Sequence, residues 1–98
     1  MSVARQAVPF DVARHVLWHY FGDKNLGIPG GHFVERLLWL MSAADDENLE
    51  RIREGFPEYV RAWEKAAREP WGLEWLRAIV KDELDGRELA LDFLAADS

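Results

Sequence analysis

The 98 residues suffice for one hydrophobic core and are too few for a second, so we expect a single helical domain spanning residues 1–98. Hydrophobic residues make up 49% of the chain and aromatic residues 12%, which excludes an intrinsically disordered protein. Twelve basic and 18 acidic residues give a net charge of −6, a sign that disfavours binding to nucleic-acid phosphates.

The chain contains no cysteine, which excludes disulfides, thiolate zinc sites and a cysteine nucleophile. Small domains outside the cell usually need disulfides, so the composition favours a cytoplasmic protein. Charged residues interrupt every apolar run well before the roughly 20 residues that span a bilayer, and residues 1–10 do not resemble a signal peptide. We therefore expect no contact with a membrane.

A first helix is predicted over residues 11–20, between the start signals Pro9 and Asp11 and the stop signal Gly22. Residues 22–31 contain four glycines and one proline, which predicts a loop. A second helix follows over residues 32–43. Its apolar spacing predicts one buried stripe, made of Phe33, Leu37, Leu40, Met41 and Ala44.

A third helix is predicted over residues 46–54, with Asp45 as its N-cap and Gly55 as a left-handed residue that closes it. Pro57 then begins a fourth helix, which runs to Arg68 and separates apolar from charged residues sharply.

The fifth predicted helix covers residues 71–84 and carries two apolar stripes, which indicates a central position in the fold. Asp85 and Glu88 have the spacing of a capping box, so residues 85–98 are predicted as a short sixth helix, although Leu89, Leu91 and Phe93 also alternate as in a strand. The sequence thus predicts an all-α fold, a single compact bundle of five or six short helices.

The turns and caps of residues 29–68 form a recognisable pattern. Pro-Gly-Gly-His-Phe at 29–33 is followed by Ala-Ala-Asp-Asp-Glu-Asn at 43–48 and Gly-Phe-Pro-Glu-Tyr-Val at 55–60. This pattern resembles small uncharacterised all-helical proteins of actinobacteria and their phages. The resemblance implies a shared helical scaffold and carries no activity or functional residue.

The histidines offer the strongest hint of metal binding. His15 and His19 lie four residues apart on one helix, so both rings could reach one ion, and His32 or Asp23 could supply a third ligand. A His-Glu-x-x-His motif is absent, and both rings border the apolar face, where histidines commonly cap a core. We therefore predict no metal site and no cofactor, with these residues as the alternative.

Motifs for catalysis are absent. The Gly-rich loop lacks the Gly-Lys-Ser/Thr ending of a phosphate-binding loop, threonine is missing, and the three serines lie in no nucleophile motif. The pairs Glu47/Arg51, Glu64/Arg68 and Glu83/Arg87 have the spacing of ordinary surface ion pairs. The sequence therefore predicts that the protein is not an enzyme.

The tryptophans indicate a binding surface. Trp63, Trp71 and Trp75 lie on apolar faces and are predicted to be core residues. Trp18 beside Arg14 and Trp39 beside Arg36 point away from their apolar stripes, so each is exposed unless its helix is covered on a second side. Exposed tryptophan next to arginine is typical of protein interfaces.

We therefore expect a non-enzymatic protein-binding module or homodimer that uses Trp18, Trp39, Arg14 and Arg36. If the resemblance to phage proteins extends to function, the partner is a host protein. The alternatives are a small His-dependent metal protein and an acidic nucleic-acid mimic. The mimic is suggested by residues 45–98, whose eight basic and fifteen acidic residues give a net charge of −7.

Overall fold

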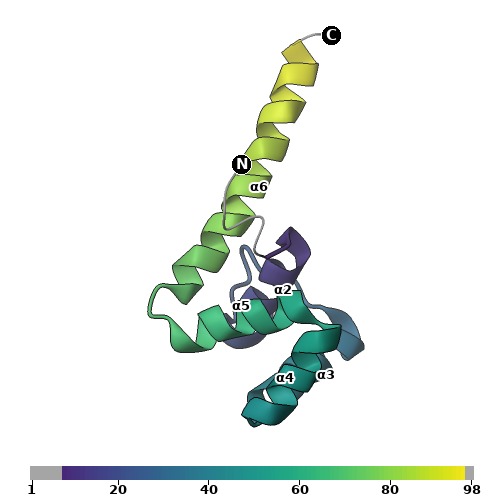
Figure 1. Cartoon of the computed structure of the whole chain (residues 1–98). Coiled ribbons are helices and arrows are strands. Elements are labelled where there is room, and N and C mark those ends of the chain that lie inside the picture. Colours follow the sequence, from purple (N-terminus) through teal and green to yellow (C-terminus); the bar gives the residue numbers. More distant parts are fainter. Residues whose placement is uncertain (1–7, 97–98) are drawn as a thin grey trace.

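The computed structural model describes residues 8–96, which form five α-helices and no strand (Figure 1). The all-α prediction is confirmed. The helices, in chain order, are α2 (Phe10–Phe21), α3 (Gly31–Ala43), α4 (Asp46–Gly55), α5 (Pro57–Arg68) and α6 (Gly72–Ala96). Over this part of the chain no helix is both long enough and apolar enough to cross a lipid bilayer.

Helices α2 and α5 occupy the centre of the bundle. Helix α5 packs against all four other helices, and α2 packs against α3, α5 and α6. The prediction that residues 71–84 form the central helix is wrong, because α6 packs mainly against α2 and α5. The core is made of small and medium aliphatic side chains from all five helices, among them Val16, Leu38, Leu49, Val60 and Leu76.

Most predicted helix ends are confirmed. Gly22 follows α2 in the left-handed conformation (φ 61°), and the Asp45 side chain accepts a hydrogen bond of 2.8 Å from the Asn48 amide at the start of α4. Pro57 begins α5, as expected. Gly55 is not left-handed; it is the last residue of α4, and the chain turns at Phe56 with φ −136°.

The predicted break after Leu84 is wrong, because one continuous helix runs from Gly72 to Ala96. Residues 85–96 are helical, as expected, but they extend α6 instead of forming a sixth helix; residues 97–98 lie outside the described part of the chain. A single glycine inside a helix costs only about 1 kcal/mol, and contacts of Arg87 cross the junction. Its guanidinium lies 4.4 Å from the Phe10 ring centre and 3.5 Å from a Glu83 oxygen.

The second half of α6 projects beyond the bundle. The 25 residues of α6 measure about 37 Å, and the molecule extends 54 × 26 × 25 Å along its principal axes. In Figure 1 the yellow end of α6 points away from α3 and α4, which lie at the opposite end of the molecule. The fold therefore combines a small bundle with a projecting helix.

The loop between α2 and α3 is fixed by a buried carboxylate. Asp23 is 8% exposed and accepts hydrogen bonds from the amides of Asn25 and Leu26 and from Arg77 Nε at 3.0 Å. These hydrogen bonds, the Leu26 amide first, hold the pKa of Asp23 below its ordinary value. Gly27 then passes so close to the backbone of Trp18 that a Cβ atom would lie 2.7 Å from its nitrogen.

Replacing Asp23 with alanine removes this anchor. We expect Asp23→Ala to lower the free energy of unfolding by about 2 kcal/mol, because two loop amides lose their acceptor. Glu74→Ala is the control, since Glu74 also binds Arg77 but is 71% exposed, and it should cost less than about 0.5 kcal/mol. Urea unfolding followed by circular dichroism measures both; equal effects would contradict the anchoring role.

Candidate protein-binding surface

The outer surface of α3 carries large apolar side chains that the bundle does not cover. Phe33 is 65% exposed, Trp39 68% and Leu40 56%. The prediction that Phe33 and Leu40 belong to the core is therefore wrong, whereas Leu37 and Met41 on the same helix are buried as expected. The reason lies in α4, which packs mainly against α5 and leaves this side of α3 open.

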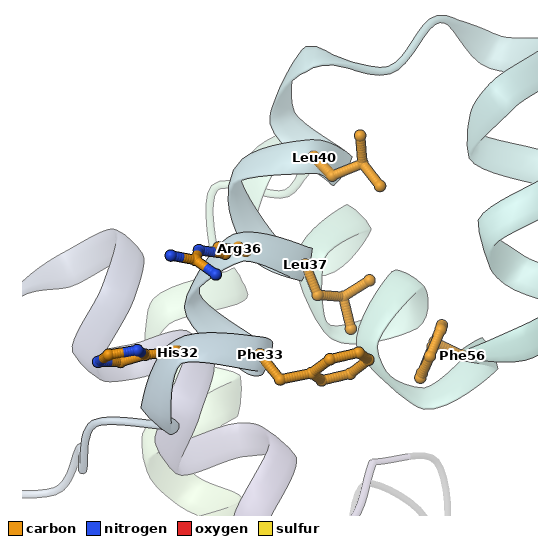
Figure 2. Close-up of a pocket in the computed structure, with 6 residues that line it drawn as sticks. All are labelled: His32, Phe33, Arg36, Leu37, Leu40 and Phe56. Carbon is orange, nitrogen blue, oxygen red and sulfur yellow. The ribbon is translucent and has the colours of Figure 1, made fainter.

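The open side of α3 borders two adjoining hollows. The first, of about 530 Å³, is lined by His32, Phe33, Arg36, Leu37, Leu40 and Phe56. Figure 2 shows Phe33, Leu37 and Leu40 projecting from α3 to the side on which Phe56 lies. The second, of about 250 Å³, shares Leu40 and continues along Ala44 and Ile52 towards Arg51. We call the two hollows together the α3–α4 groove.

The charged residues that line the α3–α4 groove are basic or histidine. His32 and Arg36 extend from one flank of α3 (Figure 2), and Arg51 lies on α4. Arg51 is paired with Glu47 at 2.9 Å, whereas Arg36 is exposed and forms no ion pair with any other described residue. Because no carboxylate lines the groove, its charge favours an acidic occupant.

Of the four predicted interface residues, the structure leaves those of α3 exposed and covers those of α2. Trp39 packs edge-on against the His19 ring, with 5.5 Å between ring centres, and keeps most of its surface exposed. Trp18 and Arg14 are half-buried, because the loop after α2 lies against this helix; Arg14 Nε donates to the Leu26 carbonyl at 3.0 Å.

Helix α3 is held firmly from its inner side. The Tyr20 hydroxyl donates to the Leu38 carbonyl at 2.6 Å and lies 2.9 Å from the Ser42 hydroxyl, and burial raises the pKa of Tyr20 to about 12. His19 Nδ1 contacts a carboxylate oxygen of Glu35. The exposed apolar side chains are therefore presented on a fixed scaffold.

The histidines do not converge on a common point. His15 Nδ1 shares a hydrogen bond of 2.7 Å with the Tyr59 hydroxyl, His19 contacts Glu35, and His32 lies at the groove. Within residues 8–96 no group of three or more His, Asp or Glu side chains is arranged to hold a metal ion. The i,i+4 pair on α2 instead ties this helix to two different neighbours.

Most of the remaining tryptophans pack against the core, and several acidic residues form ion pairs with arginines of the same helix. Trp63 and Trp75 pack partly buried against the core, but Trp71 is 45% exposed and its predicted burial is wrong. All three predicted surface ion pairs form, at N–O distances of 2.9, 3.2 and 3.5 Å: Glu47–Arg51, Glu64–Arg68 and Glu83–Arg87. Because arginines neutralise these carboxylates locally, the pattern does not favour a nucleic-acid mimic.

Comparisons with protein-family models, with curated proteins and with solved structures found no significant match to this chain.

Substitution of two leucines of α3, one exposed and one buried, distinguishes its open side from its core side. We expect Leu40→Ala to change the free energy of unfolding by less than about 1 kcal/mol, since over half of Leu40 is already exposed. Leu38→Ala should cost about 2–5 kcal/mol, because Leu38 is fully buried and its loss leaves a cavity. Urea unfolding of both variants measures this, and a large cost at Leu40 would contradict its exposure.

Stability should fall in mild acid because of His15. Burial lowers the pKa of His15 below its ordinary value of 6.5, with Arg14 adding to the shift and Asp11 and Glu35 opposing it. As the pH falls, His15 is therefore protonated in the unfolded chain before it is protonated in the folded protein. The free energy of unfolding consequently decreases below about pH 6.5.

The expected result is a smaller loss of stability in His15→Gln than in the unchanged protein between pH 7 and about pH 5.5. Thermal unfolding over this pH range measures it. His32→Gln is the matched control, because His32 is exposed at the groove and makes no such contact. Equal pH slopes for the unchanged protein and His15→Gln would show that His15 is not the responsible group.

Proposed function

We propose that this protein is a non-enzymatic protein-binding module that receives a helix of its partner in the α3–α4 groove. The observation that carries the proposal is the exposure of Phe33, Trp39 and Leu40 on one helix that is anchored from behind. Phe33 and Leu40 border an apolar hollow, and exposed apolar surfaces of this kind often mark interaction sites, while a rigid exposed tryptophan near an arginine, as Trp39 is near Arg36, is typical of binding hot spots.

The shape and charge of the groove indicate the kind of partner. Two adjoining apolar hollows beside a helix suit an amphipathic helix, which places its own apolar stripe on Phe33, Leu37 and Leu40. The flanking cations, above all Arg36, which has no ion pair within residues 8–96, favour acidic residues on the rims of that helix. We therefore take the occupant to be an acidic amphipathic helix.

The lining of the groove supports binding without catalysis. The side chains around the first hollow are aliphatic, aromatic or those of Arg36 and His32, and His32 is the one histidine among them. A lone exposed histidine lacks the second, orienting group that acid–base or nucleophilic catalysis requires. If the resemblance to phage proteins extends to function, the helix belongs to a host protein.

A designed peptide tests this proposal. The probe is an amphipathic helix with leucine along one face and glutamate on the other, and the control peptide replaces glutamate with lysine. We expect the acidic peptide to shift the amide NMR signals of Phe33, Leu40 and Phe56, whereas the lysine peptide binds at least about tenfold more weakly.

Variants then locate the contact. Phe33→Asp places a carboxylate inside the groove near the start of α3 and should abolish binding of the acidic peptide. Asn25→Asp adds the same charge at an exposed position outside the groove and should leave binding intact. Absence of binding up to about 1 mM peptide, or binding that Phe33→Asp does not weaken, would rule out the groove as a helix-binding site.

A further inference from the structure

The projecting half of α6 is largely uncovered where its side chains are described. Every residue from Asp85 to Ala90 is exposed, Leu89 to 73%, and the helix continues to Ala96. The sequence of this half continues with Leu91, Phe93 and Leu94. A short helix in water is only marginally stable without packing, so an apolar helical segment of this kind needs a surface to cover it.

The charge of this segment is opposite to that of the α3–α4 groove. Residues 85–96 contain three acidic residues and one basic residue, a net charge of −2. The basic residue, Arg87, lies over the Phe10 ring at the base of the projection, so the segment beyond it carries Glu88 and Asp92 alone. The projecting helix thus has the chemistry that the groove favours.

The same molecule cannot bring the two together. Helix α6 is continuous, and its projecting half and the α3–α4 pair lie at opposite ends of the 54 Å long axis (Figure 1). An intramolecular contact would require α6 to break and reverse its direction. The groove of a second copy is open to the same helix without any change of fold.

We propose that two copies of this chain form an antiparallel, two-fold symmetric dimer in which residues 85–96 of each copy lie in the α3–α4 groove of the other. This inference rests on the proposed function, because it names the helix that occupies the same groove. The lengths agree: twelve helical residues span about 18 Å, and the stretch of α3 from Phe33 to Ala43 spans about 15 Å.

The two-fold arrangement also explains how helices this short can form a stable dimer interface. Each copy places residues 85–96 in the groove of the other copy, so one dimer contains two helix–groove contacts. Two such contacts bury twice the surface of one, which brings the interface closer to the roughly 1,600 Å² that stable complexes bury in total.

Complementation between two variants tests the arrangement. Phe33→Asp disables the groove and leaves the projecting helix intact; Leu89→Asp disables the helix and leaves the groove intact. We expect the unchanged protein and the Asn25→Asp control to be dimers, and each of the two variants to be a monomer, by light scattering coupled to size-exclusion chromatography from about 10 µM to 1 mM.

An equimolar mixture of the two variants should regain association, because one intact helix then meets one intact groove. Circular dichroism confirms that each variant is folded. A monomeric unchanged protein, a Leu89→Asp variant that stays dimeric, or a mixture that stays monomeric would each overturn the exchanged dimer. The acidic-peptide titration distinguishes the two claims, since the peptide still binds a monomeric protein if the groove receives helices and self-association alone is absent.

Discussion

The structure depends on how α3 is packed. This helix is apolar over more than one stripe, but the bundle covers only its inner side, where Leu37, Leu38 and Met41 are buried. Helix α4 packs mainly against α5 and so leaves the outer side of α3 open. A chain of this size has too few helices to cover every apolar stripe, and the surplus remains on the surface.

The shortage of covering helices is also seen at the other end of the molecule. Helix α6 uses its first half to complete the core with Leu76, Ile79 and Val80, and residues 85–90 at the start of its second half are exposed. The two uncovered regions differ in the sign of their charge. An apolar groove flanked by Arg36 and an apolar, acidic helix are complementary, which makes a second copy of the chain a chemically consistent partner.

The sequence predicts the local features of this fold well because caps, prolines and ion pairs act over a few residues. The Asp45 cap, the start of α5 at Pro57 and the three glutamate–arginine pairs are all as predicted. Contacts between residues far apart in the chain cannot be predicted from such short sequence patterns. Periodicity places Phe33 and Leu40 on an apolar stripe, but whether another helix covers that stripe depends on the path of α4.

The candidate surface was therefore predictable in part. The exposure of Trp39 and Arg36 follows from their position off the apolar stripe, whereas Trp18 and Arg14 have the same pattern and are covered by a loop that Asp23 fixes. Phe33, Leu40 and Phe56 carry no sequence signal that separates them from core residues. The continuous α6 through Asp85 and Gly86 is accompanied by a contact of Arg87 with Phe10, more than seventy residues away in the chain, which local sequence patterns do not reveal.

The most direct test of the account is an isotope-filtered NMR experiment on an equimolar mixture of labelled and unlabelled protein, which detects contacts between copies alone. The exchanged dimer predicts intermolecular nuclear Overhauser effects between the methyl groups of Leu40 and those of Leu89. Intermolecular effects between Leu40 of one copy and Leu40 of the other would contradict the exchanged dimer. The absence of any intermolecular effect near 1 mM protein would also contradict it, because a dissociation constant of about 1 mM marks the weakest association that could hold such a dimer together.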